Sequence, residues 1–192
     1  MLQNFKNIVL VFSAALLSFA TFRFDPELKR PHGLPTELNT VIVTDSFLYA
    51  DSLELPLYKI PKVSQIHTVA KLELGKWAKL FTVLKIEESG SDGQTSVYAL
   101  KYYNLVGMRY PQKRKTTAIR RGYSYYSVYE NWYESIIDFQ YYMDYMEGSF
   151  YRKFKRYPKN EKEFVRHIHG SYNVYDKWLR DVFWLLDNFH YR

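Results

Sequence analysis

Two adjacent acids, Glu87 and Glu88, are the residues of this sequence whose type and position most suggest chemistry. They end the stretch "KWAKLFTVLKIEE", in which Glu88 continues an apolar stripe at helical spacing made of Trp77, Leu80, Phe81 and Leu84. A carboxyl on an apolar stripe is poorly hydrated, so its charged form is disfavoured and its pKa rises. Such a group can hold a proton near neutral pH and donate it to a leaving oxygen, as a glycosidase general acid does.

A purely structural explanation of these acids stays open at this point. Either carboxylate could form an ion pair with one of the 27 Lys and Arg residues of the chain. Glu87 lies on the adjacent side of the same stripe, and the pattern places Lys79, Thr82 and Lys85 on the opposite side of the helix. Periodicity alone therefore does not say which acid would act.

The sequence offers few residue patterns for any other kind of catalytic or metal-binding site. The chain has no Cys, which excludes a disulfide framework, a thiolate nucleophile and a thiolate metal site. In "HIHG" the spacing of His167 and His169 would point the two rings apart on a helix, so a metal site is not expected there. No Gly-rich phosphate loop or Ser-His-Asp order occurs. We therefore predict neither a metal nor a cofactor.

Length and composition indicate one domain with an anionic partner. A chain of 192 residues can bury one real core. The net charge of +7 favours nucleic acid, an anionic membrane surface or an acidic cell-wall polymer as partner, and does not choose among them. The 19 Tyr and 13 Phe suit a cleft whose rings stack on sugars or bases, although half-buried Tyr filling a small core would give the same counts.

The amino-terminal residues resemble an export signal. Lys6 precedes the apolar run "NIVLVFSAALLSFATF", and Ser18-Phe19-Ala20 offers the small residues that a signal peptidase needs. We predict a secretory signal over 1–20, with an uncleaved anchor and a buried first helix as alternatives. Three prolines then mark 21–38 as a linker or arm, which leaves 39–192 for the folded domain.

The first half of this domain is expected to be mainly helical. The pattern predicts a helix over 61–74 that ends at Gly75, followed by the helix that carries the two acids. The stretch "TVIVTDSFLYADSLEL" before them has a strand-like first half and a helix-like second half, and both assignments stay open. Alternating β-branched and aromatic residues over 113–129, around Arg121-Gly122, predict a small β-hairpin.

Three helices are expected after the hairpin. A long helix from about Trp132 places Ile136, Phe139, Met143 and Met146 on one face. Asn160 and Glu163 form a capping signature for the next helix, which Gly170 closes. The last helix is predicted to turn inward Tyr175, Leu179, Val182, Leu186 and Phe189. The fold class is therefore mainly α, of the α+β type, with one hairpin lobe.

Four segments in one order resemble a known family. "IEESG" resembles a helix end of the peptidoglycan glucosaminidases, glycoside hydrolase family seventy-three, and "YYNLVGMRYPQKRKTTA" looks like that family's "NNLFGMK.P..R.T.A". "RGYSYYSVYENWYESIIDFQYY" and "GSYNVYDKW" are similar to two later family segments. The resemblance spans about Pro61 to Leu186, with departures that include Tyr103, Val106 and Trp178.

The resemblance implies a function and a set of site residues. It makes Glu88, directly before Ser-Gly, the catalytic acid, and it implies substrate contacts by Asn104, Tyr125, Tyr126 and Tyr172. The implied fold is lysozyme-like, with a helical lobe and a hairpin lobe beside a glycan cleft. The implied protein is a secreted or periplasmic, bacteriolytic peptidoglycan hydrolase that cleaves after N-acetylglucosamine, with peptidoglycan strands as its partner and no nucleic acid.

Several alternatives accompany this interpretation. The chain could be a non-catalytic cell-wall-binding protein or a phage virion structural protein that keeps the fold. It could also be membrane-anchored through an uncleaved amino terminus, which would be its one membrane contact. The basic stretch "QKRKTTAIRR" could be a nucleic-acid patch or a solvated loop, whereas its place in the family favours contact with an anionic wall polymer.

The hairpin region lacks a second acid. Residues 105–129 contain no Asp or Glu, whereas glycosidases usually pair the general acid with another carboxylate. Asp92 and Glu130 flank the region without an obvious place across a cleft from Glu88. We therefore expect the N-acetyl group of the substrate to assist, with Tyr172 steadying it.

Overall fold

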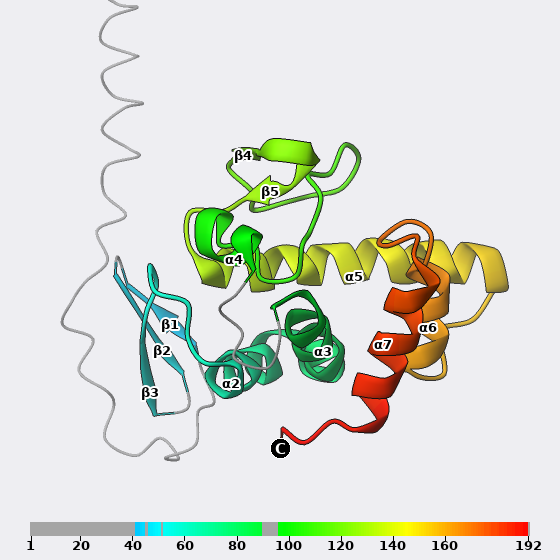
Figure 1. The fold of residues 1–192 in the computed structure, drawn as a ribbon, viewed down its shortest axis with the longest axis horizontal. Helices are drawn as coiled ribbons and strands as arrows, with labels where there is room; N and C mark the ends of the chain where they lie inside the picture. The colour runs from blue at the N-terminus through cyan, green and yellow to red at the C-terminus, as the bar shows by residue number, and fades with distance from the viewer. Residues whose placement is uncertain (1–40, 45, 51, 90–95, 192) are drawn as a thin grey trace, which may run out of the picture. The chain divides into compact units, whose positions relative to one another are not determined.

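The computed structural model describes residues 41–44, 46–50, 52–89 and 96–191 (Figure 1). The predicted signal over 1–20 and the predicted linker over 21–38 lie outside the described residues, as does Asp92. Within the described part, none of the helices has both the length and the apolar character of a membrane span. The fold is mainly helical with small antiparallel sheets, as the sequence predicts.

The stretch that the sequence left open forms a three-stranded antiparallel meander. Its strands are β1 (Ile42–Val43), β2 (Phe47–Ala50) and β3 (Leu53–Pro56), in the order β1-β2-β3. Leu48 pairs with Leu55 in the register, and both are buried, whereas Phe47 and Tyr49 point to solvent. This alternation buries one face of the sheet against the helical core, which is the period-2 pattern of a half-buried strand.

The helices α2 (Val63–Leu74) and α3 (Ala78–Ser89) confirm the next two predicted elements. Gly75 follows α2 with a φ of +51°, and a short 3₁₀ turn, η1 (Gly75–Trp77), then leads into α3. Figure 1 shows α3 between α2 and α7 (Asp176–Asp187), and it packs against both. The helix that carries the two acids is therefore central to the core.

The central position of α3 corrects one prediction about its faces. The sequence pattern assigns Thr82 and Lys85 to a side of the helix away from the core, but both are fully buried. A helix with neighbours on several sides has no solvent face, so its polar residues must be satisfied inside. Thr82 does this in part by donating its hydroxyl to the carbonyl of Ala78 at 2.9 Å.

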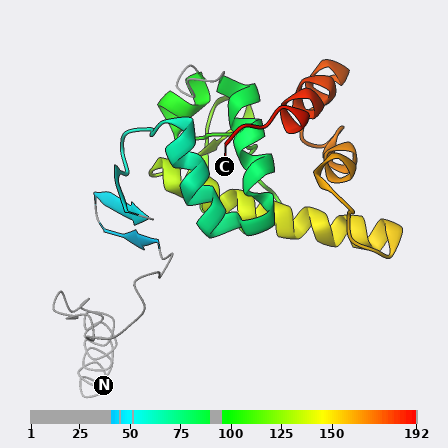
Figure 2. The ribbon, with the colours of Figure 1, turned by 90° about the horizontal axis from the view of Figure 1, so that it is seen from below.

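The last three helices also confirm their predictions, apart from one residue. The long helix α5 (Trp132–Phe154) buries Ile136, Phe139, Met143 and Met146, and α6 (Glu161–Ile168) begins where the Asn160 side chain accepts from the Glu163 N–H at 2.9 Å. Figure 2 shows α6 and α7 after the end of α5. Tyr175 is 71 % exposed, contrary to prediction, because it precedes α7 with extended backbone angles. Trp178 is buried instead.

The predicted hairpin is present and belongs to a small lobe with the helix α4 (Val97–Tyr102). Strands β4 (Arg120–Arg121) and β5 (Ser127–Val128) pair antiparallel, and a 3₁₀ turn, η2 (Tyr123–Tyr125), joins them. Gly122 lets the hairpin approach α4, because a methyl group at this position would lie 3.0 Å from the Tyr102 ring. The hairpin backbone at Gly122 therefore packs directly against the Tyr102 ring of α4.

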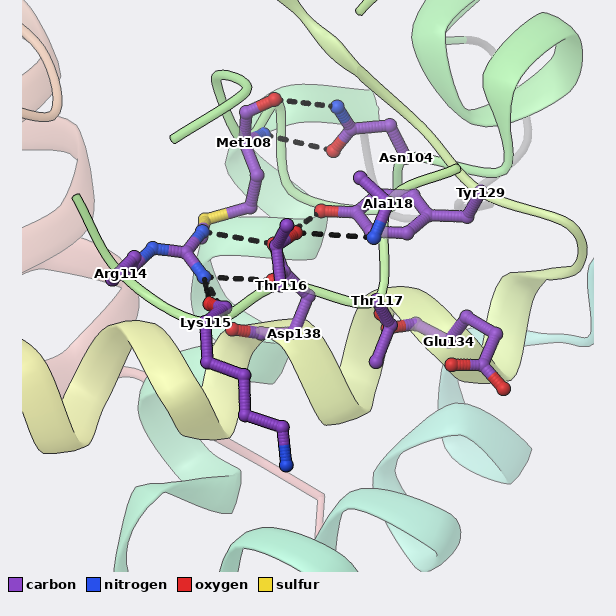
Figure 3. Close-up of polar contacts among 10 residues, drawn as sticks. All are labelled: Asn104, Met108, Arg114, Lys115, Thr116, Thr117, Ala118, Tyr129, Glu134 and Asp138. Atoms are coloured by element: carbon purple, nitrogen blue, oxygen red, sulfur yellow. Dashed lines mark hydrogen bonds and ion pairs between the residues drawn. The ribbon is translucent and has the colours of Figure 1, made fainter. Parts of the chain in front are cut away.

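A buried ion pair ties the lobe to α5 (Figure 3). The guanidinium of Arg114 donates to both carboxylate oxygens of Asp138, at 2.7 and 2.9 Å. The Tyr129 hydroxyl donates to the same carboxylate at 2.6 Å, and the side chain of Asp138 is fully buried. Bidentate, charge-assisted hydrogen bonds of this kind fix both the distance and the orientation of the two partners.

Substitution of Asp138 by Asn should destabilise the fold strongly. It removes the charge that compensates a buried guanidinium, and breaking such a pair typically costs about 3–5 kcal/mol. The free energy of unfolding, measured in urea, would report the loss. Asp187→Asn is the matched control, because the Lys162–Asp187 pair lies at the surface and its removal should cost at most about 1 kcal/mol. Equal effects of the two substitutions would contradict the anchoring role of Asp138.

Candidate active site

The carboxyl of Glu88 packs directly on the backbone of Gly107. Glu88 lies at the end of α3, and Gly107 belongs to the loop between α4 and the hairpin. A methyl group on Gly107 would lie 3.0 Å from Glu88 Oε2 and 3.1 Å from its Cδ. Gly107 also has a φ of +65°, which residues with a Cβ rarely adopt. The backbone angle therefore favours glycine at this contact, and a Cβ would also force the end of the Glu88 side chain to shift.

Asn104 holds the loop that carries Gly107 (Figure 3). Its Oδ1 accepts from the Met108 N–H at 2.8 Å, and its Nδ2 donates to the carbonyls of Met108 at 2.8 Å and Ser127 at 3.0 Å. The side chain is fully buried, so it presents no atom to a ligand. The resemblance implies that Asn104 contacts the substrate. In the structure its side chain instead holds the backbone of the loop at Met108.

Tyr172 holds the same loop from the helical side. It lies between α6 and α7, and its hydroxyl donates to the carbonyl of Val106. Burial raises the pKa of Tyr172 well above its usual value, and the nearby charge of Glu88 raises it further. The two flanking residues of Gly107 are thus fixed, Val106 by Tyr172 and Met108 by Asn104.

The surroundings of Glu88 favour its protonated form. Burial raises the pKa of Glu88 above its usual value, and the charge of Lys85, one turn earlier on α3, lowers it in part. The direction of the net shift is upward, as expected for a carboxyl on an apolar stripe. Glu88 can therefore hold a proton at a higher pH than an exposed glutamate.

Glu87 faces a different part of the molecule. Burial raises its pKa to about 7, with further contributions from the charges of Glu88 and Asp181 and an opposing one from Lys177. The nearby Trp178 indole N–H lowers the pKa of Glu87, although this N–H is not well enough placed to form a hydrogen bond with the carboxylate. The residues that act on Glu87 all lie on α7: Lys177, Trp178 and Asp181. Glu87 therefore points toward α7, whereas Glu88 contacts the loop that carries Gly107. The tertiary structure thus separates two acids that periodicity could not.

One hollow is lined by Glu88, and a second begins at Gly107. The first has a volume of about 480 Å³ and is lined by Glu88 itself together with Ser96, Val97, Tyr98, Lys101, Tyr102 and Tyr123. The second has a volume of about 320 Å³ and extends from Gly107 along the loop to Arg114, with Tyr142, Tyr145, Ser171 and Tyr172 opposite. Glu88 does not line this second hollow, and Gly107 is the lining residue that packs against the Glu88 carboxyl. Glu88 is the one acid among the described residues that line them.

The structure brings Tyr126 to this site and leaves Tyr125 outside it. Tyr126 stacks on Tyr98, with ring centroids 3.8 Å apart, and burial with help from the Tyr98 hydroxyl and the Glu88 charge raises its pKa to about 12. Tyr125 is 58 % exposed at the tip of the hairpin, beneath the guanidinium of Arg121 at 4.6 Å. Neither tyrosine lines a hollow, but only Tyr126 stacks on a residue that does, Tyr98.

Sequence reasoning missed several residues that shape the site. Tyr98 and Tyr102 lie four residues apart on α4, so helical spacing could have placed both on one face. Tyr142 contributes to the second hollow from α5. The sequence indicates Gly107 less clearly. An isolated glycine among apolar residues can mark a residue with positive φ or a place where the backbone comes close to another group. What touches the glycine follows only from the fold.

Comparison with protein-family models, with curated proteins and with solved structures found no match. A search of the described residues for three or more His, Asp or Glu side chains able to hold one metal ion also found none. Function is therefore inferred from the geometry of the Glu88 site together with the sequence resemblance.

The raised pKa of Glu87 predicts a specific pH dependence of stability. Below pH 4.5 the carboxyl is protonated in both the folded and the unfolded chain, whereas between pH 4.5 and about 7 only the unfolded chain ionises freely. The folded state therefore loses stability as the pH rises through this window. Glu87→Gln removes the ionisation, so its free energy of unfolding should rise relative to the original chain from pH 4.5 to 7 and then level off.

Urea unfolding at a series of pH values would measure this difference. Glu163→Gln is the opposite control, because hydrogen bonds from Arg156 hold the pKa of Glu163 down to about 2. Its stabilising contribution is present above pH 4.5 and is lost as the pH falls toward 2. Parallel stability curves for Glu87→Gln and the original chain would show that Glu87 does not titrate as described.

Proposed function

We propose that this protein is an exported peptidoglycan hydrolase that cleaves the glycan strand after N-acetylglucosamine, with Glu88 as its general acid. The observation that carries the proposal is a half-buried carboxyl of raised pKa, held against Gly107 and lining a hollow with three tyrosines. A general acid for glycoside cleavage must be protonated before the bond breaks, and burial raises the pKa of Glu88 in the direction that favours this state. The resemblance of "IEESG" to the glucosaminidase helix end assigns the same residue.

The composition of the two hollows supports a carbohydrate substrate. The first is lined by Tyr98, Tyr102 and Tyr123, and the second by Tyr110, Tyr142, Tyr145 and Tyr172. Tyrosine rings pack against the apolar faces of sugar rings while their hydroxyls remain hydrated. Helices on one side of Glu88 and the hairpin lobe on the other suit a lysozyme-like architecture, with the glycan strand running between them.

In the proposed reaction, Glu88 donates its proton to the oxygen of the leaving sugar as the glycosidic bond breaks. The resulting carboxylate then accepts a proton from the water that completes hydrolysis, which restores the acid for the next cycle. Gly107 and Asn104 keep the carboxyl in place through the loop. The positive charge of the hairpin lobe, in which Arg120 and Arg121 are exposed, favours an anionic wall polymer nearby.

The first displacement requires a nucleophile other than a protein carboxylate. Among the described acids near the lobe, Asp138 is held by Arg114 and Tyr129, and Glu130 is exposed. Glu134 is half-buried beside Thr117, and none of the three acids lines either hollow. We therefore propose that the acetamido oxygen of the substrate attacks the anomeric carbon and that water then displaces it. Because the Tyr172 hydroxyl already donates to Val106, its ring is the part of the side chain that remains to steady this sugar.

Glu88→Gln should abolish lysis, whereas Glu87→Gln should reduce it only mildly. The substitution of Glu88 removes the transferable proton with almost no change of volume, and loss of a general acid costs about 10²–10⁴-fold in rate. Zymography on cell-wall gels, with purified protein, would compare the two variants. Activity of the original protein should also fall as the pH rises past the pKa of Glu88.

The same experiment separates the rival functions. A cleared band supports the hydrolase, while retention on cell wall without clearing supports a binding or virion structural protein. Salt-sensitive retention on DNA with no preference for cell wall would indicate a nucleic-acid binder instead. If Glu87 proved essential and Glu88 dispensable, the assignment of the acid would be overturned.

The nascent product should retain the anomeric configuration of the substrate. Two successive displacements, first by the acetamido oxygen and then by water, invert the anomeric carbon twice. Proton NMR during the first minutes of digestion would detect the β-anomer before it equilibrates. Early release of the α-anomer, or complete loss of activity in Glu130→Gln, would exclude the mechanism with Glu88 as sole acid.

A further inference from the structure

The carboxyl-terminal end of α5 presents an exposed group of aromatic and basic residues that lines neither hollow. Residues 151–157 are all exposed, over the last turn of α5 and the start of the turn to α6. Since an α-helix has about 3.6 residues per turn, the exposed residues 151–154 point in every direction around the helix axis. In both Figure 1 and Figure 2 this end of α5 extends past α7. We call residues 151–159 the α5 tip.

Three aromatic side chains of the α5 tip lie together at the surface. Tyr151 and Phe154 are three residues apart on α5 and therefore share a face of the helix. Tyr157 lies against Tyr151, with ring centroids 5.3 Å apart. Phe154 is 44 % exposed and Tyr157 is 63 % exposed. Contiguous exposed apolar surface of this kind commonly marks a site that binds a partner.

The α5 tip is also strongly positive. Residues 151–159 contain five cations and no acid, and one of the cations, Arg156, pairs with Glu163 of α6. The other four form no ion pair with any residue that the structure describes: Arg152, Lys153, Lys155 and Lys159. The Lys153 ammonium lies over the Phe154 ring, 5.2 Å from its centroid. Unpaired cations and exposed rings are therefore interleaved on one small surface.

A partner for this surface must offer both negative charge and an apolar layer. Phe154 has no polar group on its ring, so its exposed part is stabilised only where a partner removes it from water. Tyrosine rings favour the headgroup level of a bilayer, where one end of the ring is in an apolar layer and the hydroxyl is hydrated. Lys and Arg close to an anionic bilayer add electrostatic attraction.

The geometry of the α5 tip separates a membrane from a nucleic acid. A single-stranded nucleic acid also combines ring stacking with phosphate contacts, but it follows a positively charged groove. The α5 tip is instead exposed around the whole helix axis, with cations beside the rings. An extended anionic surface, against which the end of a helix can rest, therefore fits it better.

We propose that the α5 tip binds the surface of an anionic membrane. Tyr151, Phe154 and Tyr157 lie at the headgroup level, and the four unpaired cations lie against the lipid phosphates. This contact is separate from the amino-terminal segment for which the sequence predicts a signal or an anchor. It goes beyond the proposed hydrolase activity and does not depend on it.

A fluorescent label at the α5 tip tests the contact directly. The chain has no Cys, so Tyr157→Cys creates one labelling site in the full-length protein. The emission of a nitrobenzoxadiazole label there should shift to shorter wavelength with vesicles of phosphatidylglycerol and phosphatidylcholine in equal parts, because its surroundings lose water. Tyr125→Cys is the matched control, since Tyr125 is also an exposed tyrosine beside a cation but lies on the hairpin. Its label should remain in water.

Substitution of two cations of the α5 tip should weaken vesicle binding. Lys153→Gln/Lys155→Gln should lower the affinity for these vesicles about 25-fold, because each cation near an anionic surface contributes about fivefold. Arg120→Gln/Arg121→Gln removes the same charge from the exposed hairpin and should change the affinity less than about twofold, since charges farther from the membrane are screened by salt. Co-sedimentation of unlabelled full-length protein measures both affinities. Any contribution of the amino-terminal segment is common to all variants, and circular dichroism would verify that each is folded.

Several outcomes would overturn the proposal. One is binding to vesicles of phosphatidylcholine alone that is as tight as binding to the anionic vesicles. Others are a Tyr157→Cys label that stays in water while the protein binds, and an equal loss of affinity in the two double variants. Tighter binding of polyglycerol phosphate or of a poly-dT oligonucleotide, at equal phosphate concentration, would identify a phosphate polymer as the partner. All these measurements report binding, so they can fail while the protein still clears cell wall, and the reverse also holds.

Discussion

The close contact between the Glu88 carboxyl and the Gly107 backbone is the constraint on which the site depends. It brings the end of α3 against a loop of the hairpin lobe, with no room for a side chain between them. The loop keeps its shape because Asn104 bonds to Met108 on one side of Gly107 and Tyr172 bonds to Val106 on the other. The carboxyl is thereby removed from water in part, which raises its pKa, yet it lines the hollow around Tyr98 and Tyr102. The Glu88 carboxyl is therefore partly buried and still open to a hollow, because the surface that covers it is the backbone of Gly107 and not a side chain.

The lobe that supplies this loop depends in turn on a buried charge. The lobe contains several cations and no acid over residues 105–129, so it has no internal partner for them. Asp138 on α5 provides one carboxylate, which Arg114 and Tyr129 both bind. A buried ion pair adds less stability than its short distances suggest, because both charges lose hydration. Its contribution here is positional, since a bidentate contact fixes where the segment after Met108 runs and hence where Arg109 and Lys113 stand.

The two acids that end α3 illustrate how position changes chemistry. Glu87 and Glu88 are neighbours in sequence, and the pKa of each is raised chiefly by burial. Glu87 meets Lys177 and Asp181 of α7, where its titration affects the stability of the fold. Glu88 meets a glycine and borders on open space, where its titration can serve a reaction. The same residue type therefore affects the stability of the fold as Glu87, whereas as Glu88 it is placed where it can take part in a reaction.

The sequence by itself determined the helices other than α4, the hairpin and the stripe that Glu88 continues, because periodicity, caps and turn residues act over a few neighbouring positions. It also singled out the acids and the tyrosine-rich composition. Only the tertiary structure decided that Lys85 is buried, that Tyr175 is exposed and that Asn104 supports the loop without reaching a ligand. It also gave Glu87 and Glu88 different neighbours, which periodicity could not do, and joined Gly107, Tyr126 and Tyr172 around the Glu88 carboxyl. These features depend on which element covers each side of a helix, and contacts between residues far apart in the chain leave no local pattern from which they could be predicted.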